Sequence, residues 1–170
     1  MTSDTFASRN IGDVYAGEAP KITSRHLIAI GEAGIYPSYA VRVHTDKLLY
    51  LAKQSDKKFA GIVKCMPGHD LDTAYTYSAT LNATNKVEIF GVQDDVDVWV
   101  WYVAQCPIAP IVFGDILTLS STDGMFMLFE YANGTDYTEV PALGGYCKFV
   151  EDYNAGSTTN NQLVKAHLGG

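Results

Sequence analysis

Alternation of apolar and polar residues along the chain predicts a series of short β-strands. The longest run covers residues 95–103, with the sequence Asp-Val-Asp-Val-Trp-Val-Trp-Tyr-Val. Side chains of an extended strand alternate between two faces, so one face of this run is apolar: Val96, Val98, Val100 and Tyr102. The opposite face holds Trp99 and Trp101, which need cover from another layer of the chain or from another molecule. This pattern favours a β-rich structural or assembly protein.

Other short apolar runs recur at intervals of about 8 to 12 residues, separated by Gly, Asn and Asp, which is typical of a sandwich or barrel. The expected strands are residues 26–30, 39–44, 59–65, 71–79, 86–90, 116–119, 125–131, 146–150 and 162–167. Residues 47–53 fit a strand or one or two helical turns equally well. Gly124 is expected to supply a positive φ in the hairpin loop before residue 125. The sequence thus predicts an all-β fold, a β-barrel or β-sandwich with little helix.

Two segments are distinguished by composition. Residues 1–24 are rich in Ser, Thr, Asp, Gly and Ala, and they are expected to form an extended N-terminal arm that orders only on docking. Residues 25–170 are expected to form a single β domain. Of the whole chain, 47% is hydrophobic and 18% charged, which is enough for a sizeable core.

Charge and hydropathy exclude several classes of partner. The net charge of −7 argues against electrostatic binding of nucleic acid, and the cationic segment 53–58 is predicted to be a solvated turn. No run approaches the roughly 20 apolar residues of a membrane-spanning helix. Residues 1–12 lack the charged-then-apolar order of a signal peptide, so a protein made and kept or assembled in a cytosol is expected.

The cysteines offer little support for catalysis. Cys65, Cys106 and Cys147 are odd in number and widely spaced, so buried thiols are favoured over a disulfide scaffold. A thiol hydrolase would pair Cys147 with His69 or His44, but no nucleophile motif surrounds that cysteine. Neither a catalytic residue nor a cofactor is therefore predicted.

Residues His69, Asp70 and Asp72 suggest a metal site at first sight. Zinc sites gather three or four ligands at recognisable spacings, and no such spacing occurs. Because Pro67 and Gly68 precede these residues, a turn that leads into a strand is the favoured interpretation.

The densest acidic patch is Asp94, Asp95 and Asp97. It lacks the twelve-residue calcium loop with its central glycine and final glutamate. A turn at residues 94–95 is favoured, with Asp97 solvated or acting as an edge charge against unwanted strand pairing. Carboxylates near an aromatic-rich sheet are also compatible with sugar hydrolysis or carbohydrate binding.

A second strand is apolar on nearly both faces. Met125, Met127 and Phe129 alternate with Phe126 and Leu128. Together with the Trp-bearing run, this exceeds what one layer of core would bury, so partial burial in an oligomer is favoured.

Several motifs in residues 59–168 occur in the order seen in a known family. They are Phe59-Ala60-Gly61-Ile62-Val63, Gly114-Asp115-Ile116-Leu117, Ser120-Ser121-Thr122-Asp123-Gly124 and Ala142-Leu143-Gly144-Gly145. The order resembles the small β-barrel decoration (head-stabilising) proteins of tailed phages and related archaeal viruses. The long Trp-bearing strand and the Tyr-rich middle depart from that family's pattern.

The resemblance implies a non-enzymatic protein, made in the host cytoplasm, that binds the major capsid protein on the outer capsid surface of the virion. It would be a homo-oligomer, with a trimer favoured, clamping neighbouring capsomers. The arm residues Ile11, Val14, Tyr15 and Ile22 are the candidates for capsid contact. Trp99 and Trp101 are candidates for a subunit interface or for packing. The alternatives are a viral tail, spike or fibre component, or a carbohydrate-binding β-sandwich module.

Overall fold

The computed structural model describes residues 26–56, 59–80, 85–92, 94–103, 114–128, 147–149 and 161–169. These residues form strands joined by turns and loops and contain no helix, which confirms the predicted all-β class. The strands are β1 (His26–Ala29), β2 (Ala40–Val43), β3 (Leu49–Leu51), β4 (Gly61–Val63), β5 (Lys86–Gly91), β6 (Val96–Tyr102), β7 (Leu117–Leu119), β8 (Phe126–Leu128), β9 (Cys147–Phe149) and β10 (Gln162–Leu168). Within this part of the chain, no helix is available to cross a membrane.

The first sheet has the strand order β1-β5-β4-β2-β3, with antiparallel neighbours throughout. A parallel bridge between Ile30 and Leu49 joins its two edge strands at one end. The Gly31 N–H also donates to the Leu49 carbonyl at 2.8 Å. The sheet therefore closes on itself as a small barrel, which reduces the unpaired edge. In the described part of the chain, the buried residues of its core are Ile30, Ile35, Val41, Leu49, Val63, Val87 and Ile89.

The second sheet has the order β7-β8-β6-β10-β9. Strand β6 pairs along its length with β10, from Val96 opposite Leu168 to Tyr102 opposite Gln162. It also meets β8 in parallel at Tyr102 and Phe126. The Trp-bearing strand is thus a central strand, and its buried face is the predicted one: Val96, Val98, Val100 and Tyr102.

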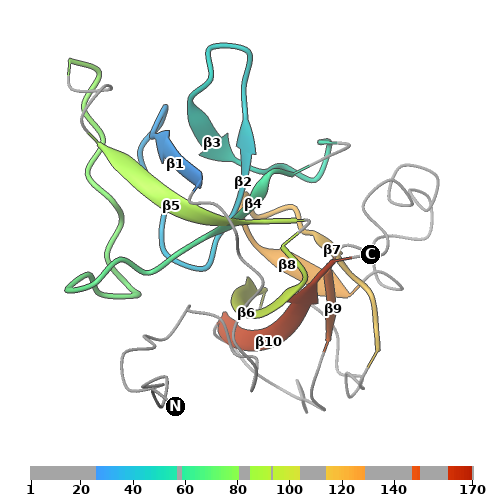
Figure 1. Cartoon of the computed structure of the whole chain (residues 1–170). Coiled ribbons are helices and arrows are strands. Elements are labelled where there is room, and N and C mark those ends of the chain that lie inside the picture. Colours follow the sequence, from blue (N-terminus) through green and yellow to red (C-terminus); the bar gives the residue numbers. More distant parts are fainter. Residues whose placement is uncertain are drawn as a thin grey trace.

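A shared core joins the two sheets, which lie in the upper and lower parts of Figure 1. Phe59 and Phe126 meet edge to face at 5.7 Å between ring centroids. Ala40, Ile62 and Phe90 from the first sheet lie in one cluster with the apolar face of β6. Within the described residues, this junction buries apolar side chains of both sheets together.

The predicted hairpin between 116–119 and 125–131 is confirmed as the antiparallel pair β7–β8, as far as Leu128. Gly124 has φ +78°, as expected for its position in the loop. Residues 47–53 contain a strand, β3, rather than helical turns.

The strand predicted at residues 71–79 is wrong. Two turns stand at its start, where the N–H of His69 donates to the Met66 carbonyl and that of Thr73 to the Asp70 carbonyl. Tyr75 and Tyr77 then cover the core of the first sheet instead of pairing with a strand. Tyr75 and Tyr77, two alternate residues of this segment, do pack on the core, but the segment has no regular secondary structure.

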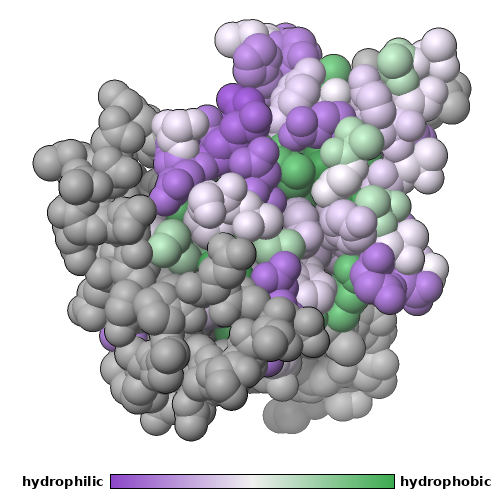
Figure 2. Space-filling view, turned by 180° about the vertical axis from the view of Figure 1, so that it is seen from behind, coloured by the Kyte–Doolittle hydropathy of each residue, from purple (hydrophilic) through white to green (hydrophobic). Residues whose placement is uncertain are grey.

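On the face seen from behind (Figure 2), the described residues expose few large hydrophobic areas. Figure 2, which views the molecule from behind, shows hydrophobic residues in small separate areas between hydrophilic ones. Among the described residues, the large hydrophobic side chains that are exposed are Leu27 and Val43. Scattered apolar residues of this kind are normal at a protein surface, so their exposure alone does not indicate an interface.

Candidate functional site

The outer face of β6 and β10 carries the residues that the sequence marked as interface candidates. Its register places Asp97 opposite His167, Trp99 opposite Lys165, and Trp101 opposite Leu163. All of these side chains are half-buried, whereas the alternate residues of β6 are buried. The face is therefore a strip of aromatic and charged pairs across two neighbouring strands.

Trp101 lies at the junction between the two sheets. Its indole N–H donates to the Pro37 carbonyl at 3.1 Å. Its ring meets that of Tyr39 edge to face, with centroids 6.4 Å apart, and packs against the shared core. Burial raises the pKa of Tyr39 above its ordinary value, with a smaller contribution from the neighbouring Tyr36. Trp101 thus has a structural task within the chain.

Trp99 differs from Trp101 although both stand on the same face of β6. It faces Lys165 across the strand pair and is not among the residues that pack against the shared core. Strand alternation alone predicts the same surroundings for both tryptophans, because it places them on the same face. The turn that contains Pro37 distinguishes Trp101, because the Pro37 carbonyl accepts the hydrogen bond from its indole N–H.

The aromatic residues near Trp101 do not form a flat platform. Tyr36 and Tyr39 are inclined by 39°, and Tyr39 and Trp101 by 78°. Sugar rings stack on flat, exposed aromatic faces, and here the indole N–H is already engaged. This geometry gives no support to the carbohydrate-binding alternative at Trp101.

The aspartates of the acidic patch at 94–97 have two structural roles: they form a turn and they contact His167. The Asp94 carboxylate accepts a hydrogen bond from the Gly91 N–H at 2.7 Å, and Asp95 has φ +55°, which confirms the predicted turn. Asp97 faces His167 instead of being solvated: its Oδ1 lies 2.7 Å from Nδ1. The other imidazole nitrogen, Nε2, lies 3.0 Å from Asp95 Oδ1.

This imidazole between two carboxylates ties the end of β10 to the start of β6. Gly169 makes room for it, because a Cβ there would lie 3.0 Å from Asp95 Oδ1 and 3.2 Å from His167 Nε2. Within the described part of the chain, no three His, Cys, Asp or Glu residues are arranged to hold a metal ion. The cluster is best described as a polar clasp between the two strands.

His69 is also held by its own loop. Its ring stacks on Tyr75 with centroids 4.0 Å apart, and Nε2 lies 2.8 Å from the Thr73 carbonyl oxygen. Burial raises the pKa of Tyr75 to about 12. Cys65 is buried, and its thiol donates to the His69 carbonyl. These contacts favour a structural loop over a metal or thiol centre, while the side chain of Cys147 lies outside the described residues.

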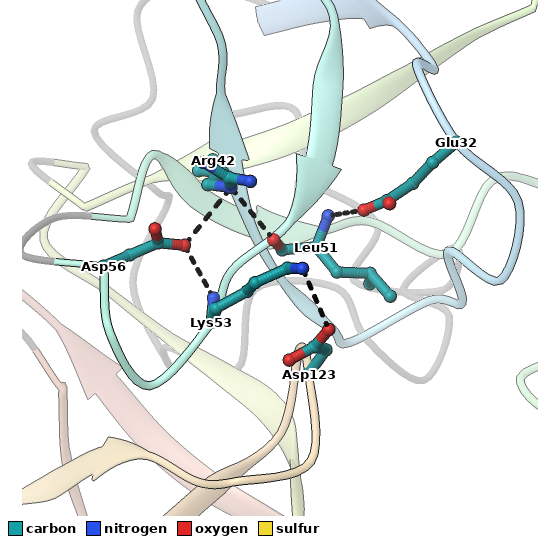
Figure 3. A network of polar contacts seen from close by, with 6 residues as sticks. All are labelled: Glu32, Arg42, Leu51, Lys53, Asp56 and Asp123. Carbon is teal, nitrogen blue, oxygen red and sulfur yellow. Dashed lines mark hydrogen bonds and ion pairs between the residues drawn. The ribbon is translucent and has the colours of Figure 1, made fainter.

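A polar network that the sequence did not suggest covers the edge of β3 (Figure 3). The Glu32 carboxylate accepts from the Leu51 N–H, and the Arg42 guanidinium donates to the Leu51 carbonyl. The backbone N–H and carbonyl of Leu51 thereby both have hydrogen-bond partners, so they are not available to pair with an added strand at this edge.

The same network reaches the second sheet. Arg42 Nε lies 3.2 Å from Asp56 Oδ2, which also accepts from the Lys53 N–H at 2.7 Å. Lys53 Nζ lies 3.8 Å from Asp123 Oδ2, in the β7–β8 loop. Residues 53–55 are exposed and 54–55 form a turn, which agrees with the solvated turn predicted for segment 53–58 as far as residue 56. Lys53 and Asp56 in addition take part in contacts that join distant strands.

The candidate arm residues Ile11, Val14, Tyr15 and Ile22 lie outside the described residues, as do Cys106 and Phe129. The proposed role of the arm therefore stays a prediction.

Comparisons with known proteins place the fold, not the family. No protein-family model matches the chain. No curated protein matches it either. Among solved structures, the chain is similar to one from "The capsid of Myoviridae Phage XM1", with a TM-score of 0.52 and 15% sequence identity. The match covers 99% of this chain and 98% of the other. At this identity the likeness shows a shared fold.

Proposed function

We propose that the protein is a non-enzymatic virion structural protein that decorates and stabilises a phage capsid by binding across neighbouring capsomers. The observation that carries the proposal is the fold likeness to a chain from a phage capsid, which extends over nearly the whole of both chains. The motifs in residues 59–168 also resemble those of decoration proteins, which supports the same role.

The polar clasp and the β3-edge network support a binding role over a catalytic one. Both engage their charged groups with one another or with the backbone, and so hold strands together. Catalytic sites instead leave a nucleophile or base poised toward a cavity. Modest contacts repeated over a symmetric shell can add up to strong stabilisation.

The proposal includes a homotrimer on the outer surface of the capsid. The arm residues Ile11, Val14, Tyr15 and Ile22 would contact the major capsid protein, as extended segments do when they add to a neighbour. Trp99 would lie at a subunit interface, because its side chain is half-buried on the outer face of the β6–β10 pair.

Immunogold labelling of virus particles from cells that carry the gene tests the location. An antibody raised against the purified protein is expected to label the capsid shell at many positions. Labelling of tails or fibres would instead support the tail, spike or fibre alternative, and unlabelled particles would remove the virion role.

A rebinding assay tests the mechanism. Particles that lack the protein are expected to rupture at a lower temperature, and the purified protein should restore their stability. A variant with Ser at positions 11, 14, 15 and 22 should fail to bind, whereas Ser3→Ala/Ser8→Ala, a control in the same arm, should bind normally. Equal binding by both variants would contradict the role of the arm.

A further inference from the structure

The hairpin formed by β2 and β3 projects from the first sheet at the top of Figure 1. Residues 43–47, at its tip, are exposed. Val43 is 44% exposed, one of two large hydrophobic side chains exposed among the described residues. The tip therefore exposes an apolar side chain together with the charged residues Asp46 and Lys47.

The tip is held in one conformation by its own contacts. The N–H of Lys47 donates to the His44 carbonyl at 2.9 Å, and that of His44 to the Leu48 carbonyl at 3.0 Å. Asp46 accepts from the Leu48 N–H at 2.9 Å and from the Tyr50 hydroxyl at 2.7 Å. These hydrogen bonds lower the pKa of Asp46, so its carboxylate is already engaged. Such preorganisation reduces the entropy lost when the tip binds a partner.

Lys47 differs from most charged residues of the structure because it lacks a partner. Arg42 and Lys53 have carboxylate partners, while Lys47 and Lys86 are the lysines whose described side chains make no ion pair or hydrogen bond. Lys47 also has φ +64°, an uncommon conformation for a residue with a side chain. The tip thus carries an exposed lysine whose side chain has no partner, on a backbone that hydrogen bonds hold in place.

Matching acidic groups stand on the segment after β4. Among the described carboxylates, those of Asp70 and Asp72 are the ones with no hydrogen-bond or ion-pair partner. Both are exposed, and the half-buried Leu71 lies between them. In Figure 1 this segment and the β2–β3 hairpin lie on different sides of the first sheet, so one copy cannot join its own two surfaces.

We propose that the β2–β3 hairpin tip of one copy docks on residues 70–72 of a second copy. Val43 would contact Leu71, and Lys47 would pair with Asp70 and Asp72. A second copy is favoured over a foreign partner because the chain carries both complementary surfaces, each with unpaired charge of opposite sign. A contact between two different surfaces is head-to-tail, and it produces a ring when the rotation closes. This inference deepens the homo-oligomer of the proposed function and rests on it.

Light scattering across a dilution series tests the contact in solution. The wild type is expected to form an oligomer, and Lys47→Glu should raise its dissociation constant by about tenfold or more. Val43→Asp should have a similar effect. Lys86→Glu is the matched control, because it makes the same charge change at another exposed, unpaired lysine. Circular dichroism of each variant verifies that the fold is retained.

A charge exchange gives the decisive comparison. Combining Lys47→Glu with Asp70→Lys and Asp72→Lys should restore assembly, because the reversed charges attract again. Failure of this rescue, an equal effect of Lys86→Glu, or a wild type that stays monomeric would each overturn the inference. The capsid role fails separately, if particles carry no antibody label, so the two proposals can be told apart.

Discussion

The N–H of Gly124, in the β7–β8 loop, donates to the carbonyl oxygen of Ala52, the residue that follows β3, at 2.8 Å. The Gly124 carbonyl in turn accepts from the Ala40 N–H at 2.8 Å. One loop residue of the second sheet therefore continues the backbone hydrogen bonding of the first. Because no side chain stands at this residue, the two backbones can approach closely.

Replacement of Gly124 by Ala is expected to destabilise the protein by about 3 kcal/mol. A Cβ would lie 2.6 Å from Tyr39 Cδ2 and 3.0 Å from Leu51 Cδ2, and φ is +78°. Gly34→Ala is the matched control, because Gly34 has φ +83° but no atom within 4 Å of its added Cβ. Urea denaturation should show a loss of only about 1–2 kcal/mol for that control. Equal losses would mean that close packing at Gly124 contributes nothing.

The two tryptophans should differ in their effect on stability. Trp101→Ala removes the hydrogen bond to Pro37 and the packing at the junction, so a loss of about 3 kcal/mol is expected. Trp99→Ala should cost less, because Trp99 does not pack against the shared core. Thermal and urea unfolding of the two variants give the comparison. A larger loss for Trp99 would contradict the packing described for β6.

Ser38 stands where glycine would be more favourable. It is fully buried, has φ +67°, and its hydroxyl has no hydrogen-bond partner in the described structure. Ser38→Gly is expected to stabilise the protein by about 1 kcal/mol, since glycine adopts positive φ without steric cost. Ser38→Ala keeps the backbone cost, so it should gain less in the same urea titration. A stabilisation by alanine that equals or exceeds that by glycine would assign the effect to the hydroxyl.

Asp97 and His167 should be energetically coupled. A double-mutant cycle with Asp97→Asn and His167→Gln is expected to give a coupling energy of about 0.5–1 kcal/mol. The matched cycle with Asp95→Asn should give a smaller value, because the Asp95 side chain is 63% exposed and that of Asp97 only 26%. A larger coupling energy with His167 for Asp95 than for Asp97 would contradict this prediction and assign the main contact of the clasp to Asp95.

Tyr75 makes stability depend on alkaline pH. Its pKa is raised from 10.0 to about 12 in the folded protein, chiefly by burial. Above pH 10 the unfolded chain loses the phenol proton while the folded protein retains it, so the free energy of unfolding falls from pH 10 to 12. Below pH 10 this contribution is fully present.

The Tyr75→Phe variant isolates that effect. It should be less stable below pH 10, because the hydroxyl donates to the Lys64 carbonyl and accepts from the Met66 N–H. Its stability should also fall less steeply between pH 10 and 12 than that of the wild type. Denaturant titrations over this range measure both slopes, and parallel slopes would contradict the role of Tyr75.

Local patterns in the sequence determined most of the strands and the buried face of β6. Period-two alternation places residues 96, 98, 100 and 102 on one side of any extended strand, whatever its neighbours. Gly124 was identified as a loop residue because a positive φ favours glycine. The acidic pair Asp94–Asp95 likewise predicts a turn from local sequence. Each of these features depends on residues close together in the chain.

The tertiary structure alone decided the strand order, the clasp and the different surroundings of Trp99 and Trp101. Asp97 and His167 meet because β6 pairs with β10, and Trp101 meets Pro37 because the two sheets share a core. Residues 71–79 show the same alternation, but this segment packs on the core of the first sheet through Tyr75 and Tyr77 and does not form a strand. Pairing and coverage of this kind depend on contacts between distant parts of the chain, which a local pattern of side chains does not specify.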